Sequence, residues 1–149
     1  MKIVLAVDGS RCSEAAIEAV ARRPWPTDSQ LRIISVIEPV APVTTEPWIP
    51  SAESLAQVEI GQRADAEKTL SQAAEKLRTV NGHSQLNITK YILTGSPKRI
   101  IVEEAERWGA DLIVVGSHGY RSWERMLLGS VSQAVSMHAE CSVEIVRER

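Results

Sequence analysis

Short apolar runs alternate along the chain with segments whose apolar residues recur at helical spacing. The runs predict five strands, at residues 2–7, 31–37, 86–93, 111–115 and 142–146. They are nearly continuous in Val, Ile and Leu, which is typical of strands covered on both faces. Strands that alternate with helices predict a doubly wound parallel α/β sandwich with right-handed crossovers.

Local signals mark where each helix begins and ends. The four predicted helices lie between Ser10 and Pro24, between Ser51 and Asn81-Gly82, between Ser96-Pro97 and Gly109, and over residues 130–138. The long second helix carries an apolar stripe at spacings of four and three, made of Ala66, Leu70, Ala73, Leu77 and Val80. Residues 39–50 are rich in proline and carry Trp48, so they predict a loop.

The architecture also predicts where a ligand would bind. In open α/β sheets the ligand lies beyond the carboxyl ends of the strands, where the strand order reverses. With the order 3-2-1-4-5, the first strand ends at Asp8 and the fourth at Gly116, side by side at that point. We therefore expect the site between these two residues.

A glycine-rich segment, GSHGYRSWERMLLGS, follows the fourth strand at residues 116–130. Gly116 allows a turn, and Gly119 can adopt a positive φ and present its N–H group to a ligand. Gly129-Ser130 places unpaired N–H groups at a helix N-terminus, which favours an anion. The segment therefore suits a phosphate, although the same residues would also serve as plain turns, with Ser130 as an N-cap.

The segment differs from the two common phosphate-binding loops. No Gly-Lys-Ser/Thr follows it, so it is not a Walker A loop. DGSRCS after the first strand lacks the glycines of the dinucleotide fingerprint. Phosphate charge would then be met by backbone N–H groups, by a metal ion, or by Arg121 and Arg125.

Composition narrows the function classes. At 149 residues the chain has the size of one domain, residues 1–149. A net charge of −2 leaves no basic surface for nucleic acid. No apolar run reaches membrane-spanning length or that of a signal peptide, so we expect a cytoplasmic protein. Cys12 and Cys141 match no metal or redox spacing, and we expect both to be buried and reduced.

Longer stretches of the sequence resemble the universal stress protein family over essentially the whole chain. They are KIVLAVDGS, SVIEP, TGSPKRIIVEEAERWGADLIVVGSHG and LLGSVSQAVSMHAECSVEIVR. The family's nucleotide-binding branch has G-x2-G-x9-G-S/T, which Gly116, Gly119, Gly129 and Ser130 fit. The resemblance implies a Rossmann-like sheet of order 3-2-1-4-5 with helices on both faces, similar to adenine nucleotide alpha hydrolases. It also implies an ATP-binding protein of the stress response.

The resemblance assigns roles to individual residues. Asp8 would lie near the ribose and phosphates and reach them through Mg²⁺, although the same carboxylate would also cap the first helix. Val36 would hold adenine through its backbone, and Ala6 would line the same pocket. The residues that would surround ribose and phosphate are Gly116, Ser117, His118, Gly119, Gly129 and Val131 through backbone groups, and Ser130 and Ser132 through hydroxyls.

The resemblance further implies a homodimer formed through the last strand, an edge strand in this topology, with Val143 and Ile145 in the seam. Family members often have Cys-Pro-Val at the start of that strand, where this chain has Cys141-Ser142-Val143. That departure leaves the nucleotide site untouched and puts only the edge in doubt.

Other polar and aromatic residues have simpler explanations. His118 has no partner acid, so we assign no catalytic residue. Glu103, Glu104 and Glu106 are expected on the solvated face of a helix. Trp48 and Trp123 are expected to pack on the body of the domain, with a lid over the nucleotide as the alternative.

Four functions were weighed against these residues. The first is an ATP-binding module in which nucleotide binding acts as a switch. The second is a slow Mg²⁺-dependent ATP hydrolase, which lacks an evident base. A phosphoacceptor of the response-regulator type needs an acid after the third strand, where the chain has Leu93-Thr94-Gly95. The fourth is an interaction module that works without nucleotide.

Overall fold

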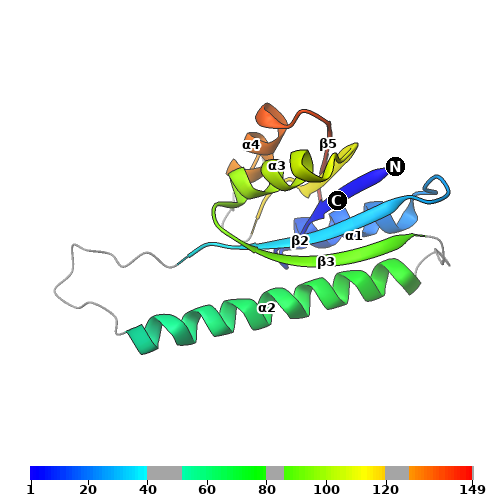
Figure 1. Ribbon diagram of the computed structural model, residues 1–149. Coiled ribbons are helices and arrows are strands. Elements are labelled where there is room, and N and C mark those ends of the chain that lie inside the picture. The colour runs from blue at the N-terminus through cyan, green and yellow to red at the C-terminus, as the bar shows by residue number, and fades with distance from the viewer. Residues whose placement is uncertain (40–51, 80–85, 120–127, 149) are drawn as a thin grey trace.

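The computed structural model describes residues 1–39, 52–79, 86–119 and 128–148 (Figure 1). One parallel sheet has the strand order β3-β2-β1-β4-β5. Its strands are β1 (Lys2–Ala6), β2 (Gln30–Ile37), β3 (Asn87–Thr94), β4 (Leu112–Gly116) and β5 (Ser142–Val146). The predicted fold class and strand order are therefore confirmed, with strand ends displaced by one residue at most.

Two helices cover each face of the sheet. One apolar cluster joins α1 (Arg11–Arg22) and α2 (Ala52–Thr79) to the sheet, and a second joins α3 (Pro97–Trp108) and α4 (Ser130–His138) to the other face. Strand alternation supplies both clusters: Ile3 and Leu5 of β1 enter the first, and Val4 enters the second. The arrangement follows from right-handed crossovers that change face where the strand order reverses.

The long helix α2 is attached along its second half and extends past the sheet with its first half (Figure 1). The predicted stripe is confirmed where it is described, because Ala66, Leu70, Ala73 and Leu77 are buried. Val80, Ser51 and residues 81–82, which carried the remaining predictions for this helix, lie outside the described residues. Burial of this stripe rather than helix propensity holds α2 in place.

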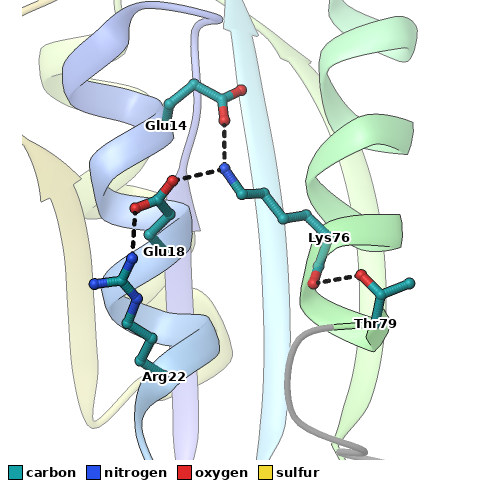
Figure 2. Close-up of polar contacts among 5 residues, drawn as sticks. All are labelled: Glu14, Glu18, Arg22, Lys76 and Thr79. Atoms are coloured by element: carbon teal, nitrogen blue, oxygen red, sulfur yellow. Dashed lines mark hydrogen bonds and ion pairs between the residues drawn. The ribbon is translucent and has the colours of Figure 1, made fainter.

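Ion pairs also fasten α2 to its neighbours. Figure 2 shows Lys76 of α2 reaching α1, where its Nζ lies 3.1 Å from Glu14 and 3.0 Å from Glu18. The hydrogen bond and charge of Lys76 lower the pKa of Glu18, and bonding to Glu18 in turn raises the pKa of Lys76. A second lysine, Lys90 of β3, binds Glu67 of α2 at 2.9 Å and lowers its pKa.

Three predictions about burial were wrong. Glu104 is 4% exposed and binds both Arg32 and Arg107, because α3 turns this side chain toward β2 rather than toward water. Cys12 and Cys141 are free but only half-buried. Coverage of both faces holds for β1, β2 and β4 but not for β3, which is an edge strand with mostly exposed or half-buried positions.

Local signals for α3 are confirmed. Ser96 is its N-cap residue and Pro97 its first residue, while Gly109 ends it in the left-handed conformation, with φ of 67°. The Ser96 hydroxyl makes no capping hydrogen bond, so the proline carries the signal. Over the described ranges, none of the helices is both long and apolar enough to cross a membrane.

Candidate functional site

The carboxyl ends of β1 and β4 lie side by side in the sheet. Ile3–Leu5 of β1 pairs with residues 112–114 of β4, and the segments that leave the two strands pass to different faces. Helix α1, which follows β1, packs on one face, whereas α4, which follows β4, packs on the other. The strand order therefore reverses at the predicted place, which is where ligands of open α/β sheets bind.

The turn from β1 into α1 forms one side of the candidate site. Asp8 is exposed, and its Oδ1 accepts a hydrogen bond of 3.0 Å from the Ser10 N–H. The N-cap of α1 is Ser10, whose hydroxyl accepts from the Ser13 N–H at 3.2 Å. Ser10 and not Asp8 is therefore the helix cap, and the second carboxylate oxygen of Asp8 lies toward Gly119. Gly9 has a φ of 78° and makes this tight turn possible.

The end of β4 forms the floor. A Cβ atom on Gly116 would lie 2.7 Å from the backbone carbon of Cys12, so only glycine permits this approach to α1. Ser117 is buried, its N–H donates to the Val146 carbonyl at 2.7 Å, and its hydroxyl lies 3.6 Å from the Cys12 sulfur. The two polar groups of Ser117 therefore connect the end of β4 to β5 and to α1.

Gly119, after the end of β4, lies against the turn that leads from β1 into α1. A Cβ atom on Gly119 would lie 2.9 Å from Oδ2 of Asp8. Gly119 does not use the positive φ open to glycine, because among the described residues only Gly9, Gly95, Gly109 and Asp28 have one. A Cβ atom here would require the exposed Asp8 carboxylate to move aside. The Gly119 N–H forms no hydrogen bond with the described part of the chain.

His118 sits between these groups. Its carbonyl accepts from the Ser10 hydroxyl at 3.4 Å, and its Nδ1 lies 3.2 Å from the Ser117 hydroxyl. Its Nε2 is buried without a hydrogen-bond partner among the described residues. These contacts tie the β4 segment to the N-terminus of α1.

The N-terminus of α4 closes the site. Gly129 is the N-cap residue, so Ser130 is the first helical residue and not the cap, and its side chain is exposed. The Gly129 N–H donates to the Ser117 carbonyl at 2.7 Å, which joins the two ends of the glycine-rich segment. The buried Ser132 hydroxyl donates to the carbonyls of Ser117 and Gly129, both at 2.9 Å.

The first-turn N–H groups of α4 are the donors left for a ligand. The first intrahelical bond runs from the Gln133 N–H to the Gly129 carbonyl, so those of Ser130 and Val131 have no helical partner. Gly129 packs against Ser117 and His118, and Gly119 lies against the Asp8 carboxylate, so these N–H groups and one carboxylate belong to the same end of the sheet. Such a set binds a phosphate through N–H groups and the helix dipole.

Ala6 and Val36 lie on the α3–α4 face at the same end of the sheet. Both are half-buried and pack against the second apolar cluster. Ala6 pairs with Ile34 in the register of β1 and β2, so Val36 lies two residues further toward the carboxyl edge. They place two apolar side chains near the carboxyl edge of β1 and β2.

A metal ion at this site would have few protein ligands. The described residues contain no cluster of three or more His, Cys, Asp or Glu side chains able to hold one. Mg²⁺ is usually bound by one or two carboxylates, with phosphate oxygens and water completing its octahedron. Asp8 fits that role as a single ligand, provided that a nucleotide supplies the phosphates.

Sequence reasoning missed Ser10, Cys12 and Thr69 at the site. The spacing of Ser10 and Ser13 before an apolar run was a readable N-cap signal. No local signal could have placed Thr69, whose hydroxyl would lie 3.3 Å from a Cβ on Gly9 across the fold. Arg121, Arg125, Trp123 and Trp48 lie outside the described residues.

Comparison with known proteins finds one matching protein-family model and several relatives of similar length. The model of the universal stress protein family matches residues 1–147. A putative universal stress protein of Staphylococcus epidermidis is 33% identical over 156 positions, covering 97% of this chain and 82% of the relative. A universal stress protein of Methanocaldococcus jannaschii is 33% identical over 147 positions, covering 99% and 82%.

Solved structures show the same fold. The universal stress protein UspA from Lactobacillus plantarum superposes with a TM-score of 0.79 at 26% identity, covering 99% of this chain and 97% of that one. A family member from Arabidopsis thaliana, solved with AMP bound, has a TM-score of 0.68 at 23% identity, covering 100% and 92%. One from Archaeoglobus fulgidus in complex with dAMP has a TM-score of 0.67 at 22% identity, covering 98% and 97%.

Proposed function

The chain belongs to the universal stress protein family, and from this premise we propose that it binds an adenine nucleotide at the carboxyl ends of β1 and β4. The carrying observation is the meeting of three segments far apart in sequence, at Asp8, Gly119 and the N-terminus of α4. They combine N–H donors for phosphate with a carboxylate for ribose or metal. We call this arrangement of Asp8, residues 116–119 and residues 129–132 the cradle. It would take ATP, ADP or AMP, and ATP is the ligand that its G-x2-G-x9-G-S motif favours.

Relatives support the adenine class. Structural neighbours include proteins solved with AMP, with cAMP and with dAMP. At 22–23% identity those likenesses speak for the fold, so the proposal rests on this chain's own residues. In it, Ala6 and Val36 contact the base, while backbone groups of His118, Gly119, Ser130 and Val131 contact ribose and phosphate.

Not every residue assigned from the resemblance has the same role in this proposal. The Ser117 and Gly129 N–H groups are already bonded to Val146 and Ser117, and the Ser132 hydroxyl bonds two carbonyls. These residues shape the cradle from beneath. Gly116 does so too, through its approach to Cys12. The Ser130 hydroxyl, on an exposed residue, remains available to a phosphate.

Mg²⁺ enters the proposal through Asp8. When bound, the ion would neutralise phosphate charge and connect it to this carboxylate. Asp8 Oδ1 is oriented by the Ser10 N–H, so the Asp8–Ser10 turn holds the carboxylate in place for that role. A slow ATP hydrolase is the alternative function, since phosphoryl transfer depends mainly on positioning and charge.

We further propose a single-domain, cytoplasmic module in which nucleotide binding acts as a switch and two copies pair along β5. Val143 and Ile145 are half-buried against the second apolar cluster, which leaves their outer edge for a partner strand. The measurement is analytical ultracentrifugation with and without ATP. A monomer under both conditions would contradict the pairing, and a dimer insensitive to ATP would contradict the switch.

The first experiment asks whether nucleotide is bound at all. Protein purified without added nucleotide is denatured, and the supernatant is resolved by anion exchange with mass detection. Stoichiometric ATP, ADP or AMP supports the proposal, and calorimetric titration then ranks the three. An empty supernatant together with no calorimetric response to ATP and Mg²⁺ would refute it and favour an interaction module that works without nucleotide.

Gly119→Val tests the cradle directly. Its side chain would strike the Asp8 carboxylate and cover the Gly119 N–H. Loss of a hydrogen bond to a charged group costs about 1.5–3 kcal/mol, so we expect affinity to fall roughly 10- to 150-fold. Gly61→Val is the matched control, since Gly61 lies in α2 with nothing within 4 Å of a Cβ. Equal affinity of Gly119→Val and wild type would mean that ligand binds elsewhere.

Asp8→Asn separates the metal from the nucleotide. The amide keeps the oxygen that accepts from Ser10 but loses the charge. We expect Mg²⁺ to stop enhancing ATP binding, while AMP binding changes little. Asp28→Asn is the control, because Asp28 has a φ of 64° that asparagine also tolerates. Undiminished Mg²⁺ dependence in Asp8→Asn would remove Asp8 from the metal site.

A further inference from the structure

A second hollow lies at the opposite end of the sheet from the candidate nucleotide site. It has a volume of about 220 Å³ and opens between the C-terminal ends of α3 and α4, where β4 and β5 begin. Val102, Ala105 and Ile113 form its buried apolar floor. The hollow is therefore a continuation of the second apolar cluster that reaches the surface.

The rim of this hollow is acidic. Glu106 and Glu140 are exposed lining residues, and neither forms an ion pair within the described part of the chain. Cys141 stands between rim and floor, half-buried. Burial raises the pKa of its thiol, and the charges of Asp111 and Glu106 raise it further.

We propose that this hollow binds a small molecule that carries a protonated amine on a compact apolar body. The apolar floor would bury the body, and the unpaired carboxylates at the rim would receive the ammonium group. An anion would meet only negative charge there. At about 30 Å³ for each water-sized group, the volume holds roughly seven non-hydrogen atoms, the size of a benzylamine or cyclohexylamine.

This proposal is independent of the nucleotide site. The hollow is lined by residues 102–113 and 139–141, none of which belongs to the cradle. For so few atoms, the expected dissociation constant lies in about the millimolar to micromolar range. Binding of an amine in the hollow does not depend on whether ATP binds at the other end of the sheet.

Cys141 provides the assay. The wild-type protein is treated with methyl methanethiosulfonate at constant pH, and the modification of each cysteine is followed by peptide mass spectrometry. Benzylamine should slow modification of Cys141 about fourfold at three times its dissociation constant, since only a quarter of the sites then stay open. Cys12 lies at the candidate nucleotide site and serves as the internal control for reagent chemistry.

Charge is tested with a ligand and a variant. Benzyl alcohol has the same apolar body without the charge, and we expect it to protect Cys141 much less. Glu106→Gln combined with Glu140→Gln should reduce protection by benzylamine to the level of benzyl alcohol. Glu103→Gln is the matched control, because Glu103 lies on the same helix but pairs with Arg99. Protection in that control should equal wild type.

The results divide clearly. Protection of Cys141 by benzylamine alone, lost in the double variant, supports the proposal. No protection overturns it, and equal protection by benzylamine and benzyl alcohol overturns the assignment to cations. Amide spectra of ¹⁵N-labelled protein give a second measurement: benzylamine should shift the signals of Gly109 and Cys141, and unshifted signals there would refute binding in the hollow.

Discussion

Removal of the Glu104 carboxylate should destabilise the protein far more than removal of any neighbouring charge on α3. Glu104 is 4% exposed and binds Arg32 of β2 and Arg107 of α3. The Arg32 guanidinium is stacked between two rings, 4.6 Å from the centre of Tyr91 and 4.2 Å from that of Trp108. Its Nε has no hydrogen-bond partner among the described residues. Glu104→Leu would therefore leave a buried cation without its anion.

The magnitude follows from this geometry. Breaking a buried ion pair from one side costs about 3–5 kcal/mol, because the remaining charge stays desolvated. Arg32 is 14% exposed and keeps its two rings, which offset part of the loss, so about 3 kcal/mol is expected for Glu104→Leu. Arg107 is 70% exposed, and Arg107→Ala should cost about 1 kcal/mol or less. Replacing both buried partners, Arg32→Met with Glu104→Leu, should recover most of the loss.

Urea denaturation followed by tryptophan fluorescence measures these differences. With a slope of about 2 kcal/mol/M, Glu104→Leu should lower the midpoint by roughly 1.5 M. Glu103→Leu is the control, since Glu103 pairs with Arg99 on the exposed surface and should shift the free energy of unfolding by about 0.5 kcal/mol at most. A cost below about 1 kcal/mol for Glu104→Leu, or a double variant as unstable as the single, would refute the argument.

Two further predictions concern the fastening of the helices. Gly116→Ala should destabilise the protein by about 1–3 kcal/mol, because its Cβ would meet the Cys12 backbone at 2.7 Å. Gly61→Ala is the control and should stabilise slightly, because Gly61 is helical and has open space around it. Thermal unfolding compares the two variants, and equal melting temperatures would contradict the close approach of Gly116 to Cys12. The pKa of Glu18 lies below its usual 4.5 when folded, so its pairing with Lys76 stabilises the protein above about that pH and is lost as pH falls through the lowered value. Lys76→Met should therefore show a smaller drop in the urea midpoint than wild type between neutral pH and the region below 4.5, and parallel pH curves would contradict this.

Much of the site was predictable because its signals are local. Asp8 and Gly116 end apolar runs, and the alternation of strands with helices predicts a parallel sheet with handed crossovers. The helix N-terminus at 129–130 was marked by its glycine and the periodic residues behind it. These features depend on neighbours in sequence, which a pattern records.

Other features depended on contacts that no pattern records. Glu104 sits among glutamates that face water, and only the approach of Arg32 from β2 explains its burial. Gly119 was singled out as able to adopt a positive φ, whereas in the structure it is marked by the approach of the Asp8 carboxylate from the segment after β1. In both cases the deciding partner is about 70 to 110 residues away.

The sequence by itself determined the strands, the helices and the helix ends, because periodicity and capping signals act over short distances. The strand order 3-2-1-4-5, which places the ligand edge, came with the resemblance to the universal stress protein family and is confirmed by the structure. Only the tertiary structure decided which N–H groups remain for a ligand and which hold the cradle together. The structure uses donors of three residues within the protein: the Ser117 N–H bonds the Val146 carbonyl, the Gly129 N–H bonds the Ser117 carbonyl, and the Ser132 hydroxyl bonds the carbonyls of Ser117 and Gly129. That division is set by three-dimensional packing, since each buried polar group must find a partner before any is left for a nucleotide.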